Sequence, residues 1–277
     1  METSAMVRPG RTAARRAARG SVTEGAARAG LAARGVIYLL VGVLALRVAF
    51  GDGDRQADRS GALAAIADKP FGAVLLWALG AGLAGMVLWR LSEAVFGSAG
   101  PDGRKPRKRL LAVVRCLFYV SGAWSVLSFA AGSGGGRSSD RQSRDLTARA
   151  LAVPAGQWLV GAVGVGIAIA GVWTGVQAVR RHYRKHLKTG ELSSRARRLV
   201  DVTGVGGGAA RGLVFAAAGA FAVRAAVDYR PEKAKGLDDT LRSLAGTPVG
   251  PWLLVLVAAG LVLFGLFSFA LARWRRV

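Results

Sequence analysis

The sequence predicts an all-α integral membrane protein, in which six transmembrane helices form three tandem helical hairpins around a pseudo-threefold axis. Three observations lead to this prediction: apolar and charged residues are segregated, several charge-free stretches are long enough to cross a membrane, and one hairpin pattern occurs three times. Of the 277 residues, 52% are hydrophobic and 20% are charged, and the mean hydropathy is +0.34. This composition excludes intrinsic disorder for most of the chain and is not typical of a soluble domain.

Charge-free stretches locate four of the six spans. A helix crosses the hydrocarbon core, roughly 30 Å thick, with about 20 residues. The stretches long enough to do so are Pro70–Trp89, Cys116–Gly136, Ala150–Val179 and Ser243–Ala272. The other two spans carry an arginine near each end, and because long arginine stems reach the membrane surface, these shorter segments also cross.

The chain therefore divides into a tail, three repeats and two connecting loops. Residues 1–27 are predicted to form a basic, flexible cytoplasmic tail. Repeat 1 covers residues 28–97, with spans at about 35–50 and 71–95, and a cytoplasmic loop follows at 98–109. Repeat 2 covers residues 110–180, with spans at about 111–131 and 154–179, and a basic cytoplasmic loop follows at 181–198. Repeat 3 covers residues 199–277, with spans at about 209–227 and 250–272.

The distribution of Lys and Arg predicts that both termini lie in the cytoplasm. The chain has 39 basic and 16 acidic residues, a net charge of +23. The termini and the two loops that join the repeats hold 23 of the basic residues, whereas the three loops within the repeats hold 11, together with ten of the acids. The positive-inside rule thus indicates a multi-pass protein of the cytoplasmic membrane, without a specific nucleic-acid partner.

The hairpin pattern has the same two marks in every copy. Each first helix has an arginine followed four residues later by an aromatic residue, and each second helix begins near a proline. The pairs are Arg34 with Tyr38, Arg115 with Tyr119, and Arg211 with Phe215; the prolines are Pro70, Pro154 and Pro248. A short helix-like segment precedes each proline. All three copies enter the membrane from the same side, which predicts parallel repeats.

These repeats resemble a bacterial membrane-protein family known as domain of unknown function 1206, from about Arg28 to Trp274. The resemblance implies three tandem two-helix repeats in the bacterial cytoplasmic membrane, and it implies no activity, substrate or cofactor. The middle copy departs from the pattern, because Cys116 replaces the glycine that follows the arginine and Leu111 stands where Gly30 and Gly207 stand in the other copies.

Three groups of residues are candidate sites. Arg34, Arg115 and Arg211 are candidates for binding lipid phosphate or another anion, with anchoring at the cytoplasmic interface as the alternative. Glu93, Arg90 and Gln177 form a candidate intramembrane polar site, with a simple Arg90–Glu93 ion pair as the alternative. Glycines predicted to allow close helix packing are Gly82, Gly85, Gly166, Gly171, Gly175, Gly260 and Gly265.

The sequence favours no enzymatic activity, because the spans contain no recognisable catalytic set. No cofactor or metal site is predicted; His182 and His186 have a suitable spacing, but neighbouring basic residues would repel a cation. The expected role is scaffolding, partner binding or envelope maintenance. The expected partners are anionic membrane lipid and either another membrane protein or a second copy of the chain. The alternative is a small-solute or ion transporter or channel along the pseudo-threefold axis, which a few serines in the third span favour.

Overall fold

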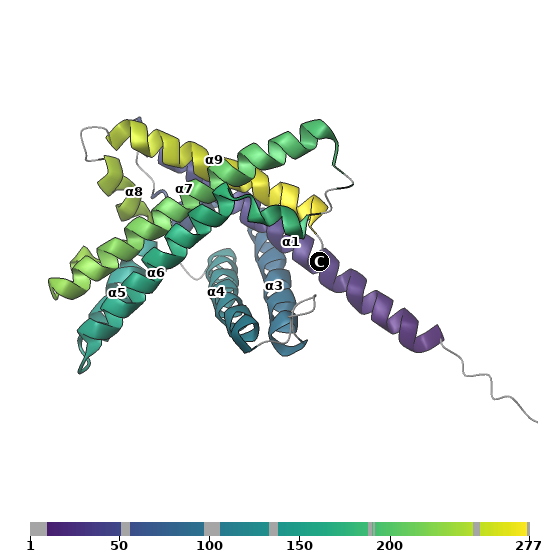
Figure 1. Cartoon of the computed structure of the whole chain (residues 1–277), viewed down its shortest axis with the longest axis horizontal. Helices are drawn as coiled ribbons and strands as arrows, with labels where there is room; N and C mark the ends of the chain where they lie inside the picture. Colours follow the sequence, from purple (N-terminus) through teal and green to yellow (C-terminus); the bar gives the residue numbers. More distant parts are fainter. Residues whose placement is uncertain are drawn as a thin grey trace, which may run out of the picture.

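The computed structural model describes residues 10–50, 56–96, 106–132, 138–187, 190, 192–245 and 250–275, which are almost entirely helical (Figure 1). The long helices are α1 (Gly10–Ala49), α3 (Gly72–Phe96), α4 (Pro106–Ala130), α6 (Gly156–Val179), α7 (Ser194–Val227) and α9 (Gly250–Trp274). The short helices are α2 (Arg59–Ala67), α5 (Ser139–Leu151) and α8 (Leu237–Ala245), with the 3-10 turns η1 (His182–His186) and η3 (Pro231–Lys233). Within these described ranges, six helices are long and apolar enough to cross a membrane, as predicted.

The three short helices confirm the segments expected before the prolines. We call the end of the bundle that carries α2, α5 and α8 the cap end, and the opposite end, where α9 finishes, the terminal end. Several helices begin earlier than predicted at the terminal end. α1 begins at Gly10, inside the predicted flexible tail, while α4 begins at Pro106 and α7 at Ser194, both inside predicted loops. From residue 10 to 27 the predicted flexible tail is helical, because its many Ala and Arg residues have high helix propensity, while residues 1–9 of the predicted tail lie outside the described residues.

The Pro-x-Gly motif forms a sharp corner between a short helix and the following span. The middle residue of the motif has a left-handed backbone, with φ of 62° at both Phe71 and Ala155. A Cβ at Gly72 would lie 2.3 Å from the carbonyl oxygen of Ile66. The chain therefore turns back so closely on the short helix that only glycine fits at the third position.

Each repeat packs against the next one through an equivalent interface. The second helix of one repeat lies against the first helix of the following repeat: α3 on α4, α6 on α7, and α9 on α1 (Figure 1). All three interfaces use the residue after the repeat arginine and the residue 17 positions after the repeat proline. The pairs in contact are Gly35 with Gly265, Cys116 with Val87, and Gly212 with Gly171.

Packing within the repeats is interrupted in the middle copy. α1 packs on α3 and α7 packs on α9, whereas α4 and α6 make no comparable contact in the described part of the chain. A Cβ at Gly30 would lie 2.8 Å from the Gly82 carbonyl oxygen, and one at Gly207 would lie 2.4 Å from a backbone nitrogen of α9. In the sequence of the middle copy, leucine takes the place of glycine at this repeat position, residue 111. The ring of helices is open between α4 and α6, and the pseudo-threefold axis stays a prediction.

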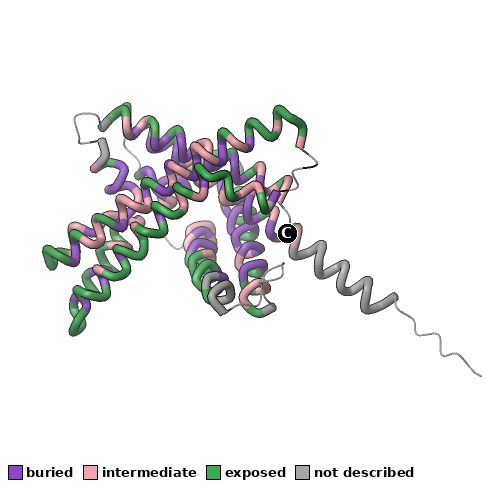
Figure 2. The backbone as a smooth tube through the Cα atoms, viewed as in Figure 1, coloured by how far each residue is buried: buried purple, intermediate pink, exposed green. Residues whose placement is uncertain are grey.

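The buried core lies mainly where α9 faces α1 and α7. Leu254, Val257 and Leu261 of α9 are fully or almost fully buried there. Figure 2 shows long exposed stretches on α6, which is the least buried of the six candidate spans. The open side of the ring is therefore also the side with the fewest buried residues.

Candidate functional site

A cavity of about 680 Å³ lies between the long helices. Side chains of α1, α4, α6 and α7 form most of its wall, and α2, α5 and the segment before α8 cover it at the cap end. Many of the wall residues are apolar, among them Val41, Val163 and Val214. The charged residues that line it from within the spans are Arg34 and Arg211.

Both arginines lie between helices of the bundle. Gly35, which follows Arg34, packs against Gly265 of α9, and Gly212, which follows Arg211, packs against Gly171 of α6. Anchoring at the cytoplasmic interface stays the alternative to anion binding for both residues.

Aromatic and hydroxyl side chains surround the two guanidinium groups. Both groups lie over the ring of Phe264, with Cζ 5.2 Å from the ring centroid for Arg34 and 5.0 Å for Arg211. Arg34 also donates from Nε to Ser268 Oγ at 3.2 Å and from Nη1 to the Tyr119 hydroxyl at 3.5 Å. Cation–π contacts and neutral hydrogen bonds hold the guanidiniums in place but do not neutralise their charge.

A second pair of arginines lies toward the terminal end. Arg90, which is 6% exposed, and Arg275 have their guanidinium carbons 4.2 Å and 4.8 Å from the Trp89 ring centroid. Arg90 Nη1 donates to Glu93 Oε2 at 2.5 Å, so this part of the predicted polar site is an ion pair. Burial, with repulsion from Arg90 and Arg34, lowers the pKa of Arg275 to about 10.

These four guanidiniums carry more positive charge than their surroundings neutralise. Each of the four has one buried N–H without an acceptor in the described residues: Nη2 in Arg34, and Nε in Arg90, Arg211 and Arg275. Within the same part of the chain, Glu93 is the one carboxylate that forms an ion pair with the group. An unpaired charge removed from water is costly, and an anion bound beside these guanidiniums would offset that cost.

The other predicted polar residues do not line the cavity. Arg115 is exposed on α4, although it is close enough to Arg90, Glu93 and Arg211 for an electrostatic interaction, so the three repeat arginines are not equivalent. Gln177 is half-buried on α6, and no hydrogen bond joins it to Arg90 or Glu93 among the described residues. Arg59 of α2 also lines the cavity near its cap end, and the sequence did not single it out.

The predicted packing glycines fall into two groups. An added Cβ would come within 3.0 Å of a facing helix at Gly82, Gly85, Gly171, Gly260 and Gly265. At Gly166 and Gly175 it would meet nothing within 4 Å, although the backbone of Gly175 lies close to Gly212. Gly166 occupies the same repeat position as Gly82 and Gly260, so its free surface is another sign of the open middle hairpin.

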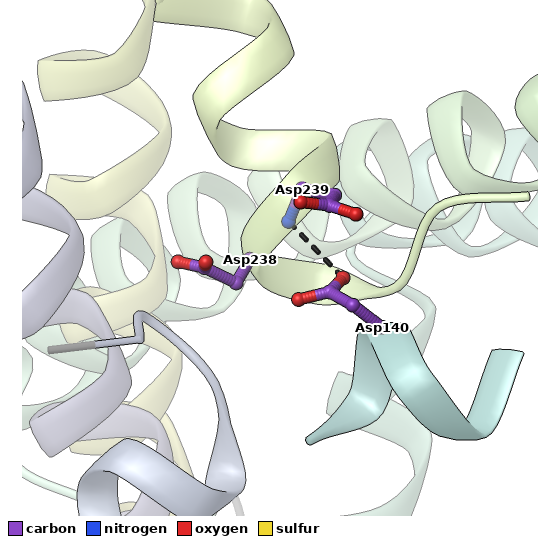
Figure 3. A group of neighbouring side chains, drawn as sticks. All are labelled: Asp140, Asp238 and Asp239. Carbon is purple, nitrogen blue, oxygen red and sulfur yellow. Dashed lines mark hydrogen bonds between the residues drawn. The ribbon is translucent and has the colours of Figure 1, made fainter. Parts of the chain in front are cut away.

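Three aspartates join the short helices at the cap end, and we call Asp58, Asp140 and Asp238 the carboxylate ring. Each one accepts a hydrogen bond from a backbone N–H at the start of the short helix of the next repeat. The bonds run from Ser139 to Asp58 at 2.8 Å, from Asp239 to Asp140 at 3.1 Å (Figure 3), and from Ala57 to Asp238 at 2.7 Å. The same contact occurs three times and closes on itself, which holds the cap over the cavity.

The sequence does contain a signal for this ring. Asp58 is the N-cap of α2, and Asp140 and Asp238 lie in the first turns of α5 and α8. Aspartate at these positions is typical of helix starts. The signal identifies the helix starts, but it does not show that each carboxylate bonds to a different repeat.

Two of the ring carboxylates belong to a compact acidic group. Ligand oxygens of Asp140, Asp238 and Asp239 lie within 4.8 Å of one another, a spacing that a metal ion could use. However, Asp238 accepts from Arg242 Nε at 2.8 Å, and Asp239 pairs with Arg144. Figure 3 shows that the Asp238 side chain points away from the other two. We therefore assign the group a structural role.

The ring carboxylates differ in acidity. Burial alone would raise the pKa of Asp58, but hydrogen bonds from Ser60, Ser139 and Gly61 outweigh it and lower that pKa. Burial raises the pKa of Asp140 to about 6, against the hydrogen bond from Asp239, and nearby carboxylates add to the rise. Ionised Asp140 therefore opposes folding at neutral pH.

Replacing Asp140 with asparagine should stabilise the protein at neutral pH, because the amide oxygen keeps the Asp239 bond without the charge. The Asp140 pKa is higher in the folded state than in the unfolded state, so the ionised carboxylate lowers the free energy of unfolding. This destabilisation is fully present above about pH 6 and disappears as the pH falls toward 4. We expect a gain of about 1 to 2 kcal/mol at pH 7.5 and a smaller one at pH 5, measured by thermal unfolding in mild detergent. Glu232→Gln, at an exposed position of η3, is the control; an equal gain at both pH values for the Asp140 variant would contradict the explanation.

Comparisons with known proteins give a family but no activity. The sequence profile of the Domain of Unknown Function (DUF1206) family matches residues 29–97, 111–181 and 206–275. The Uncharacterized protein YxxB of Bacillus subtilis (strain 168) is 33% identical over 243 residues, which is 87% of each chain. No solved structure matches the chain. The three profile matches coincide with the three helical hairpins, and the chain therefore belongs to the DUF1206 family.

Proposed function

We propose that this membrane protein binds an anionic ligand inside its helical bundle, as part of a role in envelope maintenance. The observation that carries the proposal is the pair of half-buried arginines, Arg34 and Arg211, which line the cavity without a carboxylate partner among the described residues. Each also has one buried N–H without an acceptor there. Guanidinium groups suit phosphate and carboxylate oxygens, because several N–H donors converge in one plane. Arg275 forms no ion pair among the described residues, and its charge adds to the positive potential near this site, whereas Arg90 is paired with Glu93.

The proposal is tested by the thermal unfolding of delipidated protein with added anions. Phosphatidylglycerol and inorganic phosphate are the anionic probes, and phosphatidylcholine, which has no net charge, is the control. A ligand at 100 times its Kd stabilises the folded state by about 2.7 kcal/mol. We expect at least one anionic probe to raise the unfolding midpoint and phosphatidylcholine to leave it unchanged. No stabilisation by either anion would contradict the proposal.

Transport of a small anion is the second candidate, and one observation favours it. The cavity lies among the first helices of all three repeats, and Ser121 and Ser125 add polar groups to its wall. Phosphate release from loaded proteoliposomes distinguishes the two roles, because a transporter mediates a net phosphate flux and a binding protein does not. Scaffolding for another membrane protein or a second copy is tested by quantitative co-purification from native membranes in mild detergent.

We further propose that both termini face the cytoplasm, which places the cap outside. The distribution of basic residues supports this orientation. Ala152 at the cap end and Ser194 at the terminal end are both exposed. In a Cys116→Ala background, Ala152→Cys should react with an impermeant thiol reagent added to intact cells, whereas Ser194→Cys should react only after lysis. The opposite labelling would reverse the orientation.

A further inference from the structure

The opening between α4 and α6 has a composition that suggests its occupant. Leu159, Val163 and Ile167 line the cavity and recur every four residues, so they form one stripe along α6. All three are at least 37% exposed. We call them the α6 stripe. On the facing side, the cavity is lined by Phe118 and by small or polar residues of α4.

The positions of charge and apolar surface along the cavity follow a definite order. Gly212, which follows Arg211, packs against Gly171 and Gly175 of α6. These glycines lie further toward the terminal end than any residue of the α6 stripe. The cavity therefore presents Arg34 and Arg211 on its terminal side and the apolar α6 stripe between them and the cap, where Arg59 and Lys235 line it beside Asp58.

From this order we infer that the anion is an anionic phospholipid that enters sideways between α4 and α6. The inference rests on the proposed function and names its ligand. The phosphate lies between Arg34 and Arg211, and an acyl chain follows the α6 stripe. A lipid in the leaflet on the terminal side has this same polarity, with its head group toward that surface and its chains toward the bilayer centre.

Two structural features favour a lipid over a soluble anion. The cap helices, tied together by the carboxylate ring, cover the cavity on the side from which an outside anion would arrive. The interrupted interface between α4 and α6 instead faces the surrounding membrane, because both helices are apolar spans with little buried surface. The middle repeat thus supplies an entrance that the other two repeats close with glycine contacts.

A bulky residue on the α6 stripe tests the inference without altering the arginines. Val163→Trp, at a position 52% exposed, narrows the apolar wall. Ile169→Trp, on the same helix at a position 63% exposed, is the matched control, because Ile169 is not among the residues that line the cavity. Leu159→Trp, one turn from Val163, is a second variant in case the first does not fold.

We expect wild-type protein to bind phosphatidylglycerol at least about tenfold more tightly than inorganic phosphate, as measured by thermal shift. We expect Val163→Trp and Leu159→Trp to weaken phosphatidylglycerol binding by about tenfold, and Ile169→Trp to leave it unchanged. The lipid inference would be wrong, while the proposed anion site would stand, if inorganic phosphate bound as tightly as phosphatidylglycerol and the α6-stripe variants left phosphatidylglycerol binding unchanged. If the double variant Arg34→Gln, Arg211→Gln binds phosphatidylglycerol and inorganic phosphate as tightly as the wild type does, both the lipid inference and the proposed anion site are wrong.

Discussion

Gly219→Leu is expected to prevent α6 and α7 from packing and to leave little correctly assembled protein. A Cβ at position 219 would lie 2.4 Å from the Ala168 backbone nitrogen and 2.6 Å from the Gly164 carbonyl oxygen. Both atoms are backbone of the facing helix, so no side-chain rotation relieves the overlap. Forcing extra atoms into a packed interface costs about 1 to 3 kcal/mol, and we expect more here because two whole helices must separate.

Gly166→Leu is the matched control for this prediction. Gly166 lies on α6, one of the two helices of the same interface, but a Cβ there would meet nothing within 4 Å. We therefore expect Gly166→Leu to keep the wild-type elution profile and unfolding midpoint in mild detergent, while Gly219→Leu aggregates or unfolds at a much lower temperature. A wild-type midpoint for Gly219→Leu would contradict the packing of α6 on α7.

The double variant Arg34→Gln, Arg211→Gln is expected to lose anion binding almost completely. A hydrogen bond between charged groups contributes about 1.5 to 3 kcal/mol, so loss of both guanidiniums should weaken binding by at least about 100-fold. The variant should still fold, because removing a buried charge that has no protein counter-ion also removes its desolvation cost. The thermal shift produced by phosphatidylglycerol gives the affinity, and the unfolding midpoint without lipid reports the fold.

Arg47→Gln controls for general loss of positive charge. Arg47 is exposed in the last turn of α1 and does not line the cavity. We expect this variant to bind phosphatidylglycerol as the wild type does. If Arg47→Gln and the double variant weaken phosphatidylglycerol binding equally, the lipid is attracted by the net positive charge of the protein and is not bound at a specific site.

The spans and repeats could be predicted because their signals are local. A stretch such as Pro70–Trp89 has no charge over a membrane-crossing length, and the Pro-x-Gly motif recurs at the same place in each copy. The early starts of α1 and α7 were not predicted. Both segments mix helix-forming residues with glycines and charges, and membrane hydropathy is not informative for helix that continues beyond the apolar core.

The site was predicted only in part, for a physical reason. Arg34 and Arg211 were identified as candidates, but the sequence does not show that both guanidiniums lie over the same ring, that of Phe264. That arrangement depends on the contacts of α1 and α7 with α9, which are not visible in the local sequence around either arginine. Leu111 does mark the middle repeat as different, yet an opening between α4 and α6 is a property of the packed bundle.

The carboxylate ring shows the same limit more clearly. Asp58 bonds to Ser139, 81 residues away, and Ala57 bonds to Asp238, 181 residues away. Each aspartate has a sufficient local explanation as a helix start, so nothing in the local sequence requires these partners. Only the arrangement of the three repeats brings them together.

A cryo-electron microscopy map of the full chain in nanodiscs containing phosphatidylglycerol tests the central claim most directly. The account predicts density for a phosphate group in contact with the guanidiniums of Arg34 and Arg211, continuous with an acyl chain along Leu159, Val163 and Ile167. It also predicts that this density is absent from the Arg34→Gln, Arg211→Gln variant. A well-resolved wild-type cavity that contains only water beside two unpaired arginines would contradict the claim.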